Sequence, residues 1–317
     1  MDTYFSYTDS SHRGPTVVVI GNFDGLHRGH MTLLRTAHEV AREKDARFSV
    51  LTFSPHPARV LAPHRAPPAI MSDAEKKSAF ESIGVDAVWF QSFTLEFAEL
   101  SPEDFVADVL KMGIGAVHVV VGFDFRFGKG RAGNTDTLAG LLHSHGIELS
   151  VIDAVQDGAT KVSSSVIREA MSHADIERVN DLLGWSYTIE GLVTRGDARG
   201  RTLDFPTLNI KLGNQLYPRE GVYCGWVEDE GQFRPAVANL GARPTVDDDR
   251  PGQLEVHVIH TDLGDMYDQT IRFVFCSKLR GIARFTSLEA LREQIKKDVS
   301  RAQDILKEQS PSALTIS

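Results

Sequence analysis

The pattern of apolar segments changes once along the 317-residue chain, near residue 184, and this change constrains the fold more than any other feature of the sequence. In the first part, short apolar runs alternate with stretches whose apolar residues recur at helical spacing. The runs cover residues 16–20, 48–53, 87–90, 117–121 and 149–152. Strands separated by helices of this length predict a Rossmann-like α/β domain with a mainly parallel sheet and right-handed crossovers.

The stretches between these runs carry helix signals. Residues 28–44 place their apolar side chains on one face of a helix. The segment 72–83 opens with a capping box, because Ser72 is followed three residues later by Glu75. The segment 101–112 begins with Ser-Pro, a favourable helix start. These signals support the alternation of strands and helices.

Beyond residue 184, strand-like runs follow one another with glycine and proline breaks between them. They cover residues 187–194, 207–211, 221–228, 233–240, 254–260 and 270–276. Six such strands predict a closed antiparallel β-barrel, and one amphipathic helix follows it. The apolar face of that C-terminal helix is predicted to consist of Leu288, Leu291, Ile295, Val299, Ala302 and Leu306. We therefore expect two domains, residues 1–185 and 186–317.

Composition excludes several classes of protein. Apolar residues make up 42% of the chain and charged residues 24%, as in ordinary folded proteins. The net charge of −9 argues against a nucleic-acid partner, and no run approaches the roughly 18 apolar residues that cross a bilayer. The N-terminus shows no signal peptide, and the two cysteines fit no zinc or redox motif, so we expect a cytoplasmic protein without a membrane partner. A homo-oligomer stays possible at this point.

The first candidate site is the segment GNFDGLHRGH, residues 21–30, which links the first apolar run to a helix. A glycine-flanked turn from strand to helix lets backbone N–H groups approach a phosphate. His27 and His30 are three residues apart at the helix start, so both can face the same side and bind a polyphosphate. Taken alone, the pair also fits two ordinary surface histidines, or a metal site for which no third ligand stands nearby.

Three further segments give this motif its context. TFSPHP (52–57), GFDFRFGKGRAGN (122–134) and VSSSVIREA (162–170) follow it in order along the predicted strands. Together with the G-x-F-D-x-x-H-x-G-H pattern, they resemble the nucleotidylyltransferase half of bacterial bifunctional riboflavin kinase/FMN adenylyltransferases. The resemblance covers most of residues 16–185 and implies that FMN and ATP give FAD and pyrophosphate.

The resemblance assigns residues of this half to two substrates. The implied ATP site comprises Gly21, Asn22, Phe23, Asp24, His27, His30, Ser164, Ser165 and Arg168, of which His27, His30 and Arg168 would be catalytic. The implied flavin site comprises Phe53, Pro55, His56, Asp124 and Arg126. The family commonly has threonine at the position of Ser165, which keeps the hydroxyl.

The second candidate site is the sequence PTLN within GDARGRTLDFPTLNI, residues 196–210. Thr207 and Asn209 are two apart on a predicted strand, so their side chains share a face. Hydroxyl and amide oxygens suit Mg²⁺ that carries a bound phosphate. By itself the pattern also fits two polar residues that face outward after a proline turn.

The order of later segments again supplies the context. NLGARPTV (239–246), LEVHVIH (254–260), GDMYDQTIRFVF (264–275) and KLRGIARFTSLEALREQIKKD (278–298) resemble the riboflavin kinase module of the same family, over about residues 187–306. The module would phosphorylate riboflavin with ATP, with Glu255 as the catalytic base. The implied ATP site comprises Gly196, Arg199, Gly200, Arg201, Thr207 and Asn209, with Mg²⁺ at Thr207 and Asn209. The implied flavin site comprises Glu255, Arg280 and Phe285.

Two departures from the family pattern keep alternatives open. Asp204 and Asp268 stand where the family usually has glycine, and a carboxylate near ATP phosphates repels them unless it binds the metal. One alternative is therefore that only one activity is retained, with a weakened kinase. A second alternative is another adenylyl- or cytidylyltransferase, but enzymes of that kind lack the barrel with the PTLN sequence, which weighs against this alternative. A flavin- or RNA-binding regulator on a retired scaffold is opposed by the negative charge and by the intact motif residues.

Overall fold

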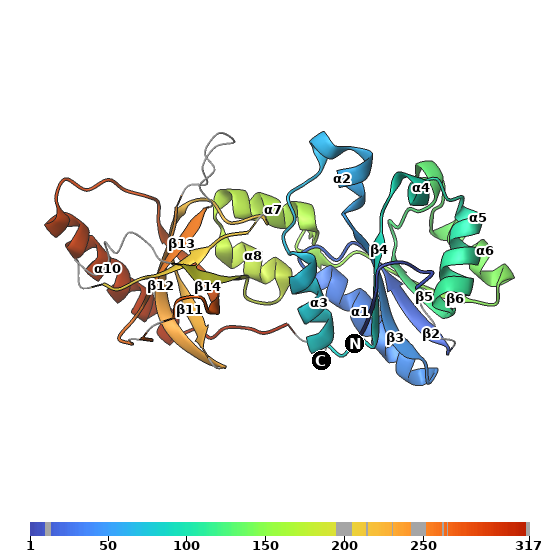
Figure 1. Ribbon diagram of the computed structural model, residues 1–317, viewed down its shortest axis with the longest axis horizontal. Coiled ribbons are helices and arrows are strands. Elements are labelled where there is room, and N and C mark those ends of the chain that lie inside the picture. The colour runs from blue at the N-terminus through green and yellow to red at the C-terminus, as the bar shows by residue number, and fades with distance from the viewer. Residues whose placement is uncertain are drawn as a thin grey trace. The chain divides into compact units, whose positions relative to one another are not determined.

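The computed structural model describes residues 1–9, 14–194, 205–213, 215–229, 231–241, 252–261, 263–264 and 266–314 (Figure 1). The chain divides into two compact units, Met1–Ser164 with Leu314, and Ser165–Ala313. The two helices that precede the barrel belong to the second unit. The expected boundary between residues 185 and 186 stays a prediction about where each activity begins. None of the helices in the described part of the chain is long and apolar enough to cross a membrane.

The first unit is built on a six-stranded sheet with the order β1-β4-β3-β2-β5-β6, and all its neighbouring pairs are parallel. The predicted parallel α/β sheet is therefore confirmed. The edge strand β1 was not predicted, because it is only three residues long. The strands are β1 (Asp2–Tyr4), β2 (Thr16–Ile20), β3 (Arg47–Ser54), β4 (Ala87–Ser92), β5 (Ala116–Gly122) and β6 (Glu148–Ile152).

Helices cover both faces of this sheet, with α1 and α3 on one face and α5 and α6 on the other (Figure 1). All five residues of β2 are buried, as a central strand between two layers of helices requires. The predicted capping box of Ser72 and Glu75 is present at the start of α3. The helical elements are α1 (Arg28–Glu43), α2 (Pro57–Leu61), η1 (Pro63–Arg65), α3 (Asp73–Ser82), α4 (Leu95–Ala98), α5 (Pro102–Asp104), the π-helix η2 (Phe105–Ile114), η3 (Lys129–Arg131) and α6 (Thr135–Ser144). A short hairpin of β7 (Gln156–Asp157) and β8 (Thr160–Lys161) follows the sheet.

The strand order fixes where a ligand can bind in this unit. The chain runs from β2 to β3 on one side of the sheet centre, and β5 lies on the other side of β2. The carboxyl ends of these three adjacent strands therefore meet at one edge, beside the point where the strand order reverses, and open α/β sheets bind ligands there. The segments that follow these strands are the sequence motifs at 21–30, 52–57 and 122–134.

The second unit contains the predicted six-stranded barrel, closed in the order β10-β13-β12-β11-β14-β9 with antiparallel pairs throughout. Observed strand ends differ from the expected ones by a few residues, most of all for β14, which continues to Arg280. The strands are β9 (Thr188–Thr194), β10 (Leu208–Lys211), β11 (Gly221–Asp229), β12 (Gln232–Leu240), β13 (Gln253–Val258) and β14 (Thr270–Arg280).

Three helices complete the second unit: α7 (Ser164–His173), which starts at the last residue of the first unit, α8 (Ile176–Leu183) and α10 (Leu288–Lys307). On α8, Asn180 donates from Nδ2 to the carbonyl of Phe275 at 3.0 Å, which ties this helix to β14. The helix α10 packs on the barrel through Ala302 and Leu306, as predicted, but Leu288 is 64% exposed and the buried face includes the acidic Asp298. Both cysteines are free and buried.

Candidate active sites

The turn after β2 has a backbone that only particular residues tolerate. Phe23, Gly25 and Leu26 have φ angles of +48°, +92° and +42°. A positive φ costs free energy for residues other than glycine. Phe23 and Leu26 are fully buried, and the burial of these two large apolar side chains offsets that cost. The N–H of Gly21 donates to the carbonyl of Leu51 at 3.1 Å, which fixes the start of the turn on β3.

The two motif histidines lie face to face at the start of α1. His27 is the N-cap residue, and its Nδ1 accepts a hydrogen bond from the backbone N–H of His30 at 3.2 Å. The two imidazole rings stack with centroids 3.6 Å apart. A side chain at Gly29 would come within 3.2 Å of the His27 ring, so glycine permits this packing. The structure thus brings His27 and His30 together, as their spacing predicts.

Burial shifts the pKa of one histidine of this pair, His30. The pKa of His30 is well below its ordinary value, first because burial disfavours the imidazolium, then because His27 and Lys76 are close. Its Nδ1 is buried and has no hydrogen-bond partner among the described residues. A neutral imidazole can donate one N–H to a phosphate oxygen without adding a charge that must be desolvated.

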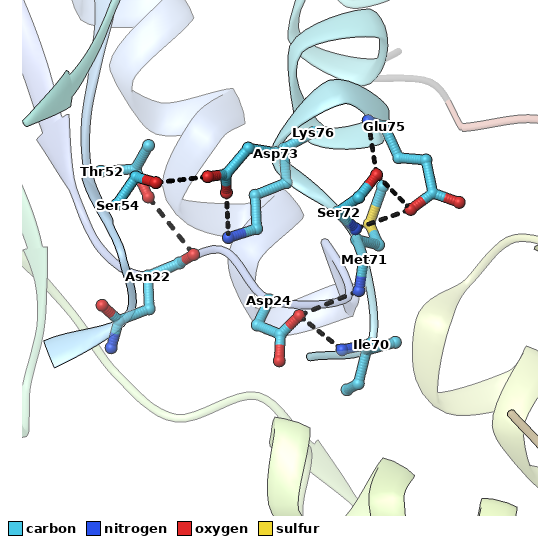
Figure 2. A network of polar contacts seen from close by, with 10 residues as sticks. All are labelled: Asn22, Asp24, Thr52, Ser54, Ile70, Met71, Ser72, Asp73, Glu75 and Lys76. Atoms are coloured by element: carbon cyan, nitrogen blue, oxygen red, sulfur yellow. Dashed lines mark hydrogen bonds and ion pairs between the residues drawn. The ribbon is translucent and has the colours of Figure 1, made fainter. Parts of the chain in front are cut away.

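Asp24 has a positioning role in this structure. Its Oδ1 accepts hydrogen bonds from the backbone N–H groups of Ile70, at 2.8 Å, and Met71, at 3.1 Å (Figure 2). The carboxylate is buried, with 4% of the residue exposed. Its backbone carbonyl accepts a hydrogen bond from the Ser164 hydroxyl at 2.7 Å, which brings Ser164 to the turn. Ser165 and Arg168 follow on α7, in the second unit.

The residues expected to hold the flavin lie after β3 and β5. Phe53 packs in an aromatic cluster with Phe93 and Phe97, whose ring centroids are 5.8 and 6.1 Å away. Pro55 follows a cis peptide bond, and Nδ1 of His56 accepts from the N–H of Ala58 at the start of α2. After β5, Asp124 is exposed and forms an ion pair of 2.5 Å with Lys161, and Arg126 is exposed. These five residues therefore lie at or just after the carboxyl ends of β3 and β5, the two strands that flank β2.

Sequence reasoning missed a buried lysine at this site. Lys76 on α3 is 5% exposed, and its Nζ lies 3.5 Å from Oδ1 of Asp73 (Figure 2). Asp73 in turn accepts a hydrogen bond from the hydroxyl of Ser54, the last residue of β3. The segment EKK is typical of a solvated helix face. The spacing of Lys76, Phe80 and Ile83 is the signal that could have placed this lysine on the buried face.

In the barrel, three polar side chains form a row across neighbouring strands. Glu255 of β13 is in register with Asn209 of β10 on one side and with Asn239 of β12 on the other. Nδ2 of Asn239 donates to Oε2 of Glu255 at 3.3 Å, and Oδ1 of Asn209 accepts from Nε2 of Gln253 at 3.0 Å. The structure therefore brings Asn209 and Glu255 together. No local pattern predicts Asn239 as a neighbour of Glu255, because their pairing depends on the register of the barrel strands.

A cavity of about 360 Å³ lies against the opposite face of two of these strands, β10 and β13. Thr207 lines it, together with the largely apolar group Val193, Pro206, Leu208, Val256, Val258, Leu263, Met266 and Tyr267. Leu208 and Val256 adjoin Asn209 and Glu255 along their strands, so the polar row faces the other side of the barrel wall. Thr207 itself precedes β10, which corrects the expectation that it belongs to the strand.

Arg280 and Phe285 also come together, with the guanidinium carbon 5.7 Å from the ring centroid. Asp268 occupies a backbone position with φ of +61°, where glycine is the unstrained residue and aspartate is tolerated. The backbone conformation explains the glycine that the family usually has here, and the exposed side chain of Asp268 does not line the cavity. The other predicted kinase residues, Gly196, Arg199, Gly200 and Arg201, and the second departure, Asp204, lie outside the described residues.

Two sites suited to polyphosphate chemistry, one at the edge of a parallel sheet and one on the wall of a barrel, define a two-domain transferase that uses nucleotides. Comparison with known proteins agrees for both halves. Residues 9–166 match the family described as FAD synthetase, and residues 183–306 match riboflavin kinase. The chain belongs to the bifunctional riboflavin kinase/FMN adenylyltransferase family, with an N-terminal FAD synthetase domain and a C-terminal flavokinase domain.

Individual relatives cover nearly the whole chain. The bifunctional riboflavin kinase/FMN adenylyltransferase of Pseudomonas fluorescens is 38% identical over 302 residues, 95% of this chain and 95% of the relative. That of Bacillus subtilis (strain 168) is 35% identical over 290 residues, 90% of this chain and 91% of the relative. A crystal structure described as a macrolide-efflux protein from Streptococcus pneumoniae has a TM-score of 0.86 and 29% identity, covering 95% of this chain and 98% of that one.

Proposed function

We propose that the adenylyltransferase activity of this bifunctional enzyme is carried by the turn after β2 and the edge of the sheet around it. ATP would lie over Gly21, Asn22 and Phe23, with its phosphates on His27 and His30. Ser164, Ser165 and Arg168 would approach the same phosphates, Arg168 through the two parallel hydrogen bonds that a guanidinium can donate. The stacked histidine pair at a helix N-terminus is the observation that supports this placement most strongly.

The chemistry of this half requires no nucleophilic side chain. A phosphate oxygen of FMN attacks the α-phosphorus of ATP in line, and pyrophosphate leaves. Holding two anions in reacting geometry contributes about 7–11 kcal/mol in favourable cases, so positioning and charge compensation account for the rate. FMN would be held by Phe53, Pro55, His56, Asp124 and Arg126, which end the strands on either side of β2.

The kinase activity is assigned to the polar row and cavity of the barrel. Glu255 would accept the proton of the terminal ribityl hydroxyl as that oxygen attacks the γ-phosphorus of ATP. Its carboxylate is exposed and accepts a hydrogen bond from Asn239, which leaves acceptor capacity for a substrate hydroxyl. Arg280 and Phe285 would border the flavin, and the loop with Gly196, Arg199, Gly200 and Arg201 would bind ATP.

Thr207 and Asn209 are the residues that would hold a magnesium ion arriving with ATP, although Thr207 lines the cavity and Asn209 lies in the polar row on the opposite face of the strand. Their hydroxyl and amide oxygens are neutral, hard donors, and Mg²⁺ commonly uses few protein ligands beside phosphates and water. The side-chain oxygen of Asn209 is already oriented by its hydrogen bond from Gln253. When bound, Mg²⁺ would offset the negative charge of the phosphates.

Product analysis with riboflavin, ATP and Mg²⁺ as the only inputs tests both assignments. The parent enzyme should convert riboflavin to FMN and then to FAD. Glu255→Ala should abolish FMN formation and still adenylylate supplied FMN, whereas His30→Ala should suppress FAD formation and spare FMN formation. Loss of both activities in a variant that remains folded would contradict the division of labour. A parent that performs only one step would favour the alternative of a single retained activity.

A further inference from the structure

The buried Lys76 is a charged residue of the first unit that the chemistry proposed above does not use. Lysine is almost never fully buried unless it is paired, since moving an ammonium out of water costs several kcal/mol. The side chain of Lys76 is 6% exposed, whereas that of Lys77, the next residue on α3, faces solvent. One helix therefore offers a buried and an exposed lysine side by side.

The partner that the described residues provide for Lys76 compensates its charge only in part. The distance from its Nζ to Oδ1 of Asp73 is 3.5 Å, which is long for a charge-assisted hydrogen bond. The Asp73 side chain is 49% exposed, and its other oxygen is engaged by the Ser54 hydroxyl. An ammonium has three N–H donors, so this one retains donors for a further anion.

The position of α3 directs this ammonium to the substrate edge of the sheet. Phe80, one turn beyond Lys76, packs edge-to-face on Phe23 of the motif turn, with ring centroids 5.8 Å apart. Figure 2 shows the Lys76 side chain running from α3 toward Asn22 in the same turn, with Ser54 beside it. Its proximity is also felt at His30, whose pKa falls chiefly through burial, then through His27, and also through Lys76. The Lys76 ammonium therefore lies between the ATP turn and the segment that leads into the flavin site.

We propose that Lys76 is a further catalytic residue of adenylyl transfer, whose ammonium binds the phosphate of FMN and holds it against the α-phosphate of ATP. A new bond forms between an FMN phosphate oxygen and the α-phosphorus, the bond from that phosphorus to the bridging oxygen breaks, and pyrophosphate leaves with the electron pair. The positive charge of Lys76 offsets the repulsion between the two anions. This inference rests on the placement of substrates proposed above.

A purely structural lysine makes opposite predictions. If Lys76 served only its ion pair with Asp73, removing either charge would have similar effects on stability and activity. If Lys76 binds the FMN phosphate, Lys76→Met should strongly reduce adenylylation of FMN. The same change keeps the apolar stem of the side chain and removes a desolvated charge, so the fold should be retained. Asp73→Asn should instead leave the ammonium in place and free more of its donors.

The experiment measures kcat and KM for FMN and for ATP in Lys76→Met, Lys76→Arg, Asp73→Asn and the matched control Lys77→Met. Riboflavin phosphorylation and thermal unfolding are measured on each preparation. We expect Lys76→Met to lower kcat/KM for FMN by about 100-fold or more, with kinase activity and Tm retained, because charge stabilisation at a transferring phosphate is typically of this size. Lys76→Arg should recover part of the loss, Lys77→Met should match the parent, and Asp73→Asn should not raise the KM for FMN.

Three outcomes would overturn the inference. The first is a Lys76→Met enzyme whose kcat/KM for FMN is within about threefold of the parent. The second is a parallel loss of Tm and activity in Lys76→Met and Asp73→Asn. The third is a loss of kcat/KM for FMN in Lys77→Met equal to that in Lys76→Met. Failure of the proposed substrate placement would look different. In that case His30→Ala would keep FAD formation, or the parent would form no FAD from FMN and ATP.

Discussion

Removing the carboxylate of Asp298 should destabilise the second unit far more than removing an exposed carboxylate from the same helix. Asp298 on α10 accepts hydrogen bonds from Nε of Arg280, at 3.1 and 3.0 Å, and from its Nη2, at 2.8 Å. Gln294 donates to the same carboxylate at 2.9 Å. The Asp298 side chain is 7% exposed and that of Arg280 is 23% exposed. Asp298→Ala would leave a guanidinium without this partner at the contact between α10 and β14.

The magnitude follows from burial and geometry. Removing one partner of a buried ion pair typically costs about 3–5 kcal/mol, because the remaining charge stays desolvated. Arg280 retains some contact with water, so we expect the low end, about 3 kcal/mol. For a unit of this size that loss lowers the midpoint of thermal unfolding by about 6–12 °C.

The assay is thermal unfolding of the full chain followed by tryptophan fluorescence, since Trp185 and Trp226 both lie in the second unit. Glu293→Ala is the control, because its 2.9 Å ion pair with Lys296 joins side chains that are 63% and 57% exposed. Pairs of that kind contribute little, so the midpoint should stay at the parent value. Equal, small shifts in Asp298→Ala and Glu293→Ala would refute the reasoning.

A double variant distinguishes the loss of a packing contact from the cost of leaving a desolvated charge unpaired. Replacing both members, as Arg280→Met with Asp298→Leu, removes the buried charges together, and such exchanges are often neutral or stabilising. The double variant should therefore recover most of the stability lost in Asp298→Ala. Because Arg280 is assigned to the flavin site of the kinase, the double variant should also raise the KM for riboflavin. A double variant less stable than Asp298→Ala would show that the packing of the two side chains dominates.

Three further stability predictions use urea or thermal unfolding of the full chain. Gly225→Ala should cost at least about 3 kcal/mol, because an added Cβ would lie 2.0 Å from the carbonyl oxygen of Val274, and an unchanged midpoint would contradict this. Gly140→Ala, inside α6 with open space around the position, should stabilise the first unit by about 1 kcal/mol, and any loss would count against it. Burial lowers the pKa of His118 despite a nearby carboxylate, so the unfolded chain binds more protons and stability falls as the pH drops below about 6.5. His118→Asn should therefore gain stability relative to the parent on acidification, whereas a difference independent of pH would contradict the argument.

The elements of both units could be predicted because their signals are local. The buried runs of β2, β3 and β5 and the capping box at Ser72 are properties of short segments, and the structure reproduces them to within a few residues. The strand β1 escaped prediction because three residues carry no measurable period. Family membership followed from motif order, which is also read directly along the chain.

Positions of charged side chains were harder to predict. Lys76 and Asp298 both lie in helical stretches whose charges look solvated, yet both are buried. Their environments depend on residues far away in sequence, the segment at Ser54 for Lys76 and Arg280 for Asp298. Local spacing could at most have placed Lys76 on the buried face of its helix with Phe80 and Ile83, and it could not identify the partners of either charge.

By itself, the sequence determined the two kinds of architecture, the histidine pair at a helix start and the family. The tertiary structure decided that the carboxylate of Asp24 holds the backbone at 70–71, that Glu255 stands between Asn209 and Asn239, and that the side chain of Lys76 is buried. The physical reason is that periodicity and capping depend on residues within one or two helical turns of each other in the sequence. Strand register, burial and ion pairing are set only when distant segments pack against one another.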